Sequence, residues 1–237
     1  MIHFLLNNSI GRILVYKRIS ACVSSEVMTL FPAEEIIDYK TMRQTIRNPD
    51  LMITQLRYYW MYKYFQEYYP DIFSSFTSVV DVGDSSGILF KAMKRIGLSV
   101  NIDRRTVEFI LSKGIDAVIG DAEKLQFADK SFDYSFCFQC LEHLPNPIRA
   151  LRELERITRK KIFISIPYVT KTIIYKNTGG HIFEFLIKDF INILSYIPLR
   201  RYDHFFLNYY SPLGSKQTNQ GSYFSFFILE PEGRNNV

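Results

Sequence analysis

The sequence predicts an α/β fold in which a mostly parallel sheet lies between layers of helices. One observation is the segment at residues 78–87, where the apolar run Val79–Val82 stops at a cluster of small residues. A second is that three further apolar runs follow, each ending in a small or polar residue. Because open α/β sheets bind ligands at the carboxyl ends of their strands, a ligand site is expected at that edge. The 237 residues, 47% of them hydrophobic, suffice for one such core.

The region before the sheet is predicted to be helical. Residues 1–33 show no clean periodicity, whereas residues 32–47 and 50–68 read as helices, the second with Asp50 as its N-cap and Pro70 as its stop. This second helix is aromatic nearly all round: Tyr58, Tyr59, Trp60, Tyr62, Tyr64, Phe65, Tyr68 and Tyr69. Aromatic stripes are usually core, which favours a helix clamped between the sheet and the extension. The alternative is a lid that closes over the ligand and lines an apolar pocket.

The elements of the sheet follow in order. A helix is expected over residues 88–96, because apolar residues recur there at steps of three and four. The further strands are expected at residues 98–103, 117–122, 132–139, 161–167, 202–210 and 222–230. Helices are expected at residues 149–159 and 184–195, with an irregular loop at residues 168–180. The last two strands are separated by a polar turn region, which predicts a closing hairpin.

The turn after the first strand is typical of a nucleotide site. Its small side chains let backbone N–H groups and the positive end of the following helix approach a ligand. Asp103 follows Gly83 by 20 positions, the separation expected for a carboxylate that binds ribose hydroxyls. A solvated acid at a strand end is the alternative for Asp103 alone, but Asp121 follows the next strand in the same way. A nicotinamide dinucleotide site is disfavoured, because Ile88 stands where that fingerprint needs a small residue.

The chain resembles a known family in the order of its motifs. These motifs are Asp81-Val-Gly-Asp-Ser-Ser-Gly87, Asp103, Gly120-Asp-Ala-Glu-Lys-Leu125, Phe132-Asp133 and Leu141-Glu-His-Leu-Pro145. They resemble those of the S-adenosylmethionine-dependent methyltransferases with a Rossmann-like fold, in particular the small-molecule branch. The resemblance covers residues 77–167, with a weaker echo at residues 180–185. One departure is Ser85, where the family usually has glycine.

The resemblance implies a three-layer Rossmann-like sandwich with a mostly parallel seven-stranded sheet and an antiparallel last strand. It implies S-adenosyl-L-methionine as the cofactor. Residues 1–70 would form an N-terminal extension and helical cap, and residues 71–237 the methyltransferase domain. The cofactor-binding residues implied by the family motifs are Asp81, Gly83, Asp84, Ser85, Gly87, Asp103, Asp121, Ala122 and Gln139.

Roles within this set follow from the same resemblance. The residues of the glycine turn are assigned to the methionine and ribose side, with Asp81 at the amino end of the cofactor. Asp103 would bind the ribose hydroxyls, Asp121 the adenine amino group and the Ala122 N–H a ring nitrogen, while Gln139 would lie near the methionine moiety.

His143 is the predicted general base, with a histidine that only caps its loop as the equal alternative. A base is needed only when the methyl acceptor carries a proton to lose. The residues expected to line the substrate pocket are Trp60, Tyr64 and His181.

Composition limits the partners that are expected. A net charge of +5 with a pI near 9.0 does not demand a polyanion, although nucleic acid stays open. Cys137 and Cys140 stand three apart on a predicted strand and are expected on opposite faces, so no metal site is predicted. The chain shows no apolar stretch long enough for a membrane span or an export signal. A cytoplasmic protein with a small-molecule substrate is therefore expected.

The leading functional hypothesis is a methyltransferase for a small, partly apolar acceptor, with O-methylation as the first choice. Enzymes that methylate nucleobase amino groups carry an Asn/Asp-Pro-Pro-aromatic tetrad after the fourth strand, and residues 139–142 read Gln-Cys-Leu-Glu instead. A cofactor-binding scaffold without turnover is an alternative, motivated by Ser85. An RNA methyltransferase is a weaker one, suggested by the pI.

Overall fold

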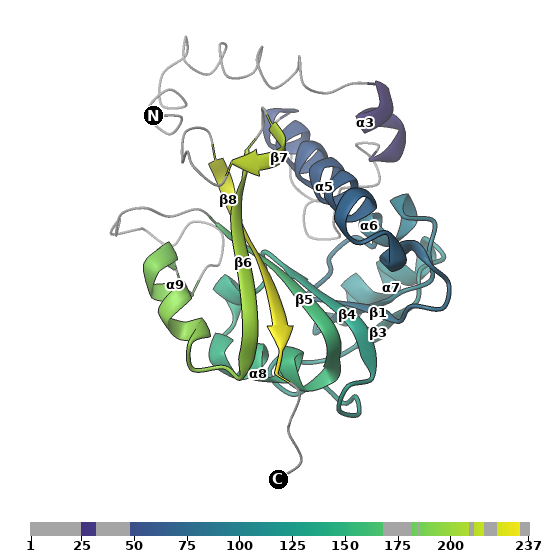
Figure 1. Ribbon diagram of the computed structural model, residues 1–237. Coiled ribbons are helices and arrows are strands. Elements are labelled where there is room, and N and C mark those ends of the chain that lie inside the picture. The colour runs from purple at the N-terminus through teal and green to yellow at the C-terminus, as the bar shows by residue number, and fades with distance from the viewer. Residues whose placement is uncertain are drawn as a thin grey trace.

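The fold is built on a sheet whose strands are the apolar runs of the sequence. The computed structural model describes residues 25–31, 48–167, 182–183, 185–208, 211–215 and 222–232. Its strands are β1 Val79–Val82, β2 Leu98–Asn101, β3 Ala117–Ile119, β4 Phe132–Phe138, β5 Thr158–Pro167, β6 Leu199–Asn208, β7 Ser211–Ser215 and β8 Ser222–Pro231. They form one sheet in the order β3-β2-β1-β4-β5-β8-β6-β7 (Figure 1).

The strand directions confirm the predicted sheet. Strands β1 to β5 pair in parallel, and the last strand, β8, runs antiparallel to both β5 and β6. The short strand β7 pairs with β6 inside the region that the sequence predicts as a polar turn, and it adds one strand to the seven expected. The carboxyl ends of the five parallel strands therefore share one edge of the sheet.

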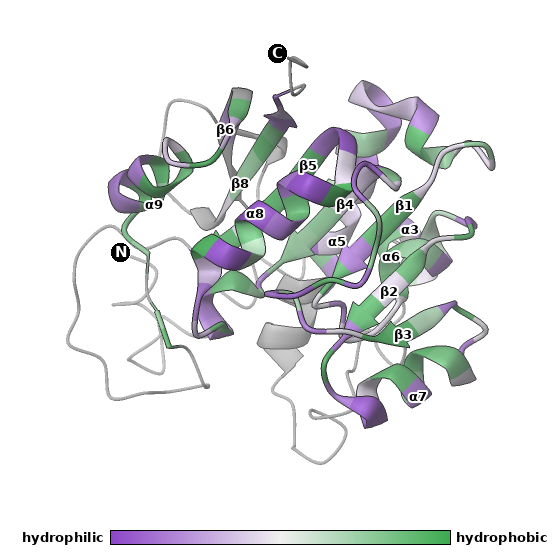
Figure 2. Ribbon diagram, turned by 90° about the horizontal axis from the view of Figure 1, so that it is seen from below, coloured by the Kyte–Doolittle hydropathy of each residue, from purple (hydrophilic) through white to green (hydrophobic). Residues whose placement is uncertain are grey.

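Helices cover both faces of the sheet, as the three-layer prediction requires. One layer contains α3 Ser25–Leu30, α5 Asn48–Tyr68, the short 3₁₀ helix η2 Pro70–Phe73, α6 Ile88–Ala92 and α7 Arg104–Ser112; the other contains α8 Pro147–Ile157 and α9 Ile187–Leu194. Val79 packs into the first layer and Val80 into the second, because neighbouring side chains on a strand point to opposite faces. Along α8 and α9, hydrophobic and hydrophilic residues alternate (Figure 2).

Several boundaries differ from those expected. Helix α5 begins at Asn48 rather than after Asp50, because Pro49 is favoured in the first turn of a helix. Helix α6 ends at Ala92, and Lys94 adopts a left-handed φ of 49°, so Ile96 is exposed instead of packing on the sheet. Residues 158–160, predicted to close a helix, are the first residues of β5. The helix predicted at residues 32–47 and the loop at residues 168–180 lie outside the described residues.

Aromatic packing joins α5 to the sheet. Phe65 is fully buried, and its ring stacks 5.1 Å from that of Phe136 on β4. It also lies 4.9 Å from Phe163 on β5 and 6.3 Å from Phe226 on β8, measured between ring centroids. The side of α5 that carries Phe65 is therefore core, which agrees with the clamped-helix interpretation. None of the helices in the described part of the chain combines the length and hydropathy of a membrane-spanning segment.

Candidate active site

Two glycines shape the loop between β1 and α6. Gly83 has a φ of 87°, and a Cβ built on it would lie 2.4 Å from Sγ of Cys140. Gly87 has a φ of 69°, and its Cβ would lie 2.5 Å from Cδ1 of Ile115. Two features therefore favour glycine at each position: the left-handed backbone and a neighbouring side chain that a Cβ would contact too closely. The Gly83 N–H donates to the Val100 carbonyl at 2.8 Å, which ties the loop to β2.

Asp84 organises this loop from within. Its carboxylate accepts hydrogen bonds from the backbone N–H groups of Ser86 and Gly87, each at 2.9 Å, and from the Ser99 hydroxyl at 2.6 Å. Ser85, at the family's glycine position, is half-buried. The Asp84 side chain therefore fixes the loop, and its predicted contact with the cofactor stays a prediction.

The end of β2 presents a residue that the sequence reasoning missed. Asp103 acts as the N-cap of α7, where its Oδ1 accepts from the Arg105 N–H at 3.0 Å. Asn101 is the last residue of β2; its Oδ1 accepts from the Asp103 N–H at 2.9 Å, and its Nδ2 donates to the Asp84 carbonyl at 2.7 Å. A polar residue directly after the buried Val100 is the signal that could have identified it.

The end of β3 joins the same edge. The Gly120 N–H donates to the Asn101 carbonyl at 3.0 Å, so the ends of β2 and β3 are in direct contact. Asp121 is exposed, and its Oδ1 accepts from the Glu123 N–H at 2.8 Å, while Ala122 is buried. The residues predicted after β1, β2 and β3 therefore follow three hydrogen-bonded strand ends.

The end of β4 has unusual backbone geometry. Gln139 has a φ of 52°, a left-handed value that non-glycine residues seldom adopt. Its N–H donates to the Ser165 carbonyl at 2.9 Å, and its side chain donates to the Ser165 hydroxyl at 3.3 Å. Backbone strain of this kind concentrates at functional sites.

The turn at Gln139 corrects the expectation for the two cysteines. Cys137 and Cys140 were predicted on opposite faces, but their thiols are hydrogen-bonded to each other, because the regular strand ends at Phe138. This hydrogen bond, together with burial, raises the pKa of Cys137. Both thiols are free, and no group of three or more potential metal ligands occurs among the described residues.

Glu142 is the most unusual side chain at this edge. It lies in the 3₁₀ helix η3 Leu141–His143 and is only 1% exposed. Neither of its carboxylate oxygens has a hydrogen-bond partner on another described residue. Burial raises its pKa to about 7, although a hydrogen bond from its own backbone N–H and the charge of Arg57 oppose this rise. The predicted base His143 is exposed, and its catalytic role stays a prediction.

Glu142→Gln is expected to remove a pH dependence of stability. The pKa of Glu142 is about 7 in the folded protein against an ordinary value of 4.5, so the folded chain binds this proton more tightly. The free energy of unfolding should therefore fall as the pH rises from about 4.5 to about 7, by roughly 3 kcal/mol at most. Urea unfolding between pH 5 and pH 8 should show a larger fall in the wild type than in Glu142→Gln, in which only the share from other buried acids such as Asp81 remains. Equal falls in both proteins would contradict the prediction.

Helix α5 places a cation and a phenol against the strand ends. The Tyr58 side chain is hydrogen-bonded to Ser86 of the glycine loop, and burial raises its pKa. Arg57 interacts electrostatically with both Asp81 and Glu142. Asp81 is 5% exposed, and burial together with the charge of Asp84 raises its pKa well above the ordinary value. At this edge, the carboxyl groups of Asp81 and Glu142 therefore both lie near the Arg57 guanidinium.

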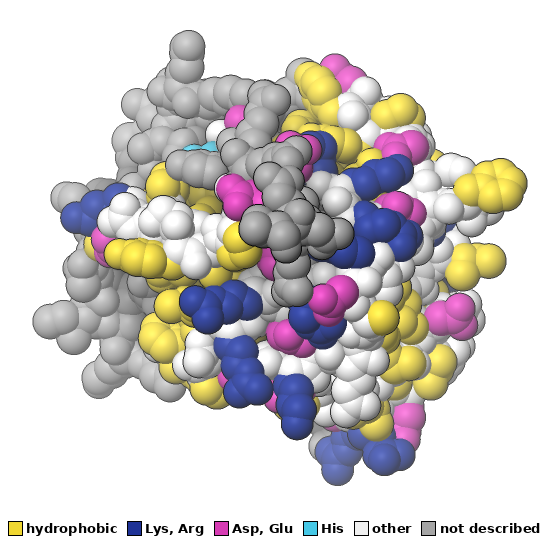
Figure 3. Space-filling model, turned by 60° about the horizontal axis from the view of Figure 1, so that its bottom comes forward, with side chains coloured by type: hydrophobic (Ala, Val, Ile, Leu, Met, Phe, Trp, Pro, Cys, Tyr) yellow, Lys and Arg dark blue, Asp and Glu magenta, His cyan; other side chains and the backbone are white. Residues whose placement is uncertain are grey.

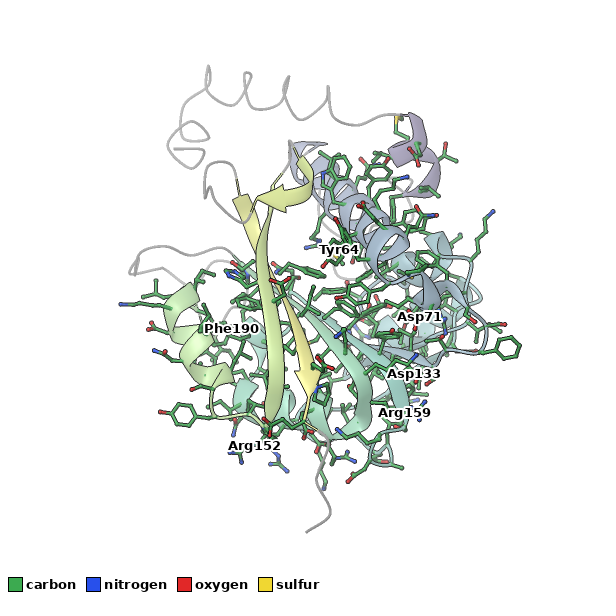
Figure 4. All side chains as sticks on the ribbon, viewed as in Figure 1. Tyr64, Asp71, Asp133, Arg152, Arg159 and Phe190 are labelled. Atoms are coloured by element: carbon green, nitrogen blue, oxygen red, sulfur yellow. The ribbon has the colours of Figure 1, made fainter. Side chains whose placement is uncertain are left out.

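Two of the predicted pocket residues lie on the same face of α5 as Arg57. Trp60 and Tyr64 follow Arg57 by three and seven positions, which is helical spacing. The Tyr64 ring lies 6.0 Å from that of Phe226, and Phe226 stacks on Phe138 at the end of β4. Tyr64 lies toward the carboxyl ends of the parallel strands, whereas Asp133 and Arg159 mark the opposite ends (Figure 4).

The pocket role of these side chains stays a prediction. Trp60 is half-buried, and its indole nitrogen is buried without a hydrogen-bond partner in the described part of the chain. His181 lies outside the described residues.

Comparison with known proteins agrees with this geometry. Residues 80–165 match the family model of the methyltransferase domain, and no curated protein matches the chain significantly. A putative methyltransferase solved in complex with the Haloferax volcanii Trm112 methyltransferase activator superposes with a TM-score of 0.62 at 13% identity, over 76% of this chain and 92% of the other.

Two further solved structures are similar. A SAM-dependent methyltransferase from Archaeoglobus fulgidus gives a TM-score of 0.57 at 18% identity, over 78% of this chain and 100% of the other. One from Thermotoga maritima, described as a possible histamine N-methyltransferase, gives 0.57 at 16% identity, over 75% and 91%. Residues 80–165 therefore match a methyltransferase domain, and the chain has the fold of the S-adenosylmethionine-dependent methyltransferases to which it is similar.

Proposed function

We propose that this methyltransferase acts on a small, partly apolar molecule, with a hydroxyl group as the leading acceptor. The observation that carries the proposal is the convergence of the glycine loop, the ends of β2 to β4 and the Arg57 face of α5 at one edge of the sheet. The partly buried rings of Tyr64 and Phe138, both packed on the buried Phe226, extend this edge and suit an apolar acceptor.

The residues at this edge fit S-adenosylmethionine. Because Gly83 has no Cβ, the loop backbone can pack against the Cys140 side chain and keep its N–H groups at the strand-end edge. The buried Asp81 suits the amino group of the cofactor. Arg57 suits its carboxylate, because the methionine end carries both charges and Asp81 and Arg57 offer their complements. When bound, the cofactor supplies an electrophilic methyl group on a sulfonium.

The other proposed roles are those that the family resemblance implies. Asp103 binds the ribose hydroxyls through the oxygen that does not cap α7, and exposed Asp121 accepts from the adenine amino group. The protein's task in the reaction is to hold donor and acceptor in line and to exclude water, which together supply several kcal/mol.

Arg57→Ala is expected to weaken S-adenosylmethionine binding about 10- to 100-fold, because it removes a charge-assisted contact of roughly 1.5–3 kcal/mol. Titration calorimetry measures the loss, and Arg152→Ala, an exposed change on α8, serves as the control. 5′-Methylthioadenosine has no carboxylate, so it should bind the wild type and Arg57→Ala equally. Equal affinity of both proteins for S-adenosylmethionine would remove Arg57 from the site.

Turnover distinguishes the enzyme from a cofactor-binding scaffold. Incubation of the wild-type protein with methyl-labelled S-adenosylmethionine and a deproteinised metabolite extract should yield a discrete labelled small molecule. Tight cofactor binding without any labelled product would favour the scaffold instead.

The RNA methyltransferase alternative has less support. On the face shown in Figure 3, basic and acidic side chains are interspersed. Arg156 pairs with Asp129 and Glu153, and Lys160 pairs with Asp71. Such pairing lowers the positive potential that a phosphate backbone needs. Strongly salt-dependent RNA binding would reverse this preference.

A further inference from the structure

Glu142 is a buried carboxyl group that the cofactor-binding roles leave unused. A carboxylate without hydrogen bonds is costly inside a protein, so each such group calls for an explanation. Glu155 shows the usual solution in this chain: it is 6% exposed, and Lys130 lies 3.0 Å from its Oε1. Glu142 is more deeply buried and has no such partner among the described residues.

Hydrogen bonds hold the backbone of Glu142 in place. The N–H groups of Ile182 and Phe183 donate to the Glu142 carbonyl at 2.8 and 3.0 Å. Three residues earlier, Gln139 turns the chain at the end of β4 through its left-handed φ. Backbone hydrogen bonds therefore fix this residue at the strand end, while its carboxylate has no side-chain partner in the described region.

Charged and titratable neighbours place the carboxyl group at the same edge of the sheet as the proposed cofactor-binding residues. Arg57 of α5 interacts with Glu142 electrostatically, and Arg57 also interacts with Asp81 beside the glycine loop. The charge of Glu142 also contributes to the raised pKa of Cys137 on β4. Glu142 thus lies near the groups proposed to hold the methionine end of the cofactor, whereas its neighbour His143 is exposed.

We propose that the carboxylate of Glu142 contacts the methyl acceptor and removes its proton, so that the acceptor is a molecule with an O–H or N–H group at the reacting atom. This inference rests on the proposed function. A buried base without a side-chain partner in the described part of the chain can form a hydrogen bond with the substrate and need not first break one with such a partner.

The step is balanced within this site. The lone pair of the acceptor oxygen or nitrogen forms a bond to the methyl carbon, and the electrons of the carbon–sulfur bond stay on sulfur. The proton of the acceptor passes to an Oε atom of Glu142 and returns to solvent after the product leaves. No oxidant or metal is needed. A pKa near 7 suits a group that must accept and then release a proton at neutral pH.

The test compares Glu142→Gln with Glu155→Gln, a matched change of a buried carboxyl group that has a lysine partner. Methyl-labelled S-adenosylmethionine is offered with two sets of acceptors: phenols and primary amines, which carry a proton, and tertiary amines and thioethers, which do not. The wild type should label only the first set. Glu142→Gln should lower the single-turnover rate about 100- to 10,000-fold, while Glu155→Gln should retain it.

Two readouts separate a proton-accepting role from a structural one. The affinity of Glu142→Gln for S-adenosylmethionine, measured by calorimetry, should stay within about twofold of wild type. The infrared absorption of buried protonated carboxyl groups should contain a component that disappears in the wild type as the pH rises through about 7, and the difference spectrum between wild type and Glu142→Gln should isolate it from the signal of buried Asp81. The wild-type rate should rise over the same pH range, and the variant should lose this dependence.

The failures are distinguishable. A wild-type protein that does not bind S-adenosylmethionine ends the proposed function. Cofactor binding with a wild-type rate in Glu142→Gln overturns only the role of Glu142, as does loss of rate in His143→Gln alone. Labelling of tertiary amines or thioethers, or of neither set, overturns the assigned acceptor class.

Discussion

Gly83→Ala is expected to weaken S-adenosylmethionine binding by about 10- to 100-fold. The added Cβ would lie 2.4 Å from Sγ and 2.7 Å from Cβ of Cys140, about 1 Å inside ordinary contact. The loop or the end of β4 must move by about that distance, and loss of one or two loop contacts with the charged cofactor, roughly 1.5–3 kcal/mol in all, weakens binding by about 10- to 100-fold. Calorimetric titration with S-adenosylmethionine measures the loss.

A matched control separates the clash from backbone strain. Gly114 has a similar φ of 76°, but nothing lies within 4 Å of a Cβ built on it. Gly114→Ala should therefore cost some stability and leave cofactor affinity unchanged. The double variant Gly83→Ala, Cys140→Gly removes both clashing atoms and should recover part of the affinity. Wild-type affinity in Gly83→Ala would show that the loop does not approach the cofactor as proposed.

Phe65→Ala is expected to lower the free energy of unfolding by about 3–5 kcal/mol. Its ring is fully buried and contacts rings on three strands, Phe136, Phe163 and Phe226, so its loss opens a cavity between α5 and the sheet. Urea unfolding followed by circular dichroism measures the change. Phe76→Ala, a substitution of a ring that is 97% exposed, should change stability by less than about 0.5 kcal/mol.

The outcome of Phe65→Ala also bears on α5 as a wall of the site. If α5 is an integral part of the core, cofactor affinity should fall together with stability, because Arg57 and Tyr58 are carried by the same helix. A fully stable Phe65→Ala protein with reduced cofactor affinity would instead identify α5 as a separately docking lid.

The glycine loop and the strand ends could be predicted from the sequence because their signals are local. Val79–Val82 is a run of buried β-branched residues and an aspartate, and Gly83 and Gly87 both have the left-handed backbone that only glycine adopts freely. The strand predicted to end at Asp103 ends at Asn101, and the predicted cofactor contact of Asp103 stays a prediction. Asp103 and Asn101 lie two positions apart, and only the start of α7 shows that Asp103 caps a helix.

The proximity of Cys137 and Cys140 could not be predicted in the same way. A strand pattern places residues three apart on opposite faces, and the sequence carries no sign that Gln139 takes a left-handed φ. That conformation is stabilised by hydrogen bonds to Ser165 on the neighbouring strand, a partner 26 residues away.

By itself, the sequence determined the order of strands along the chain, the glycine loop and the resemblance to the methyltransferase motifs, because these depend on periodicity and on residue types at short range. Only the tertiary structure decided which buried carboxylate has no side-chain partner among the described residues. Glu142 and His143 are adjacent in the chain, yet one is buried and the other exposed. The long-range neighbours of Glu142, Arg57 of α5 and the backbone of residues 182–183, come from segments far away in sequence, and packing of this kind leaves no local pattern.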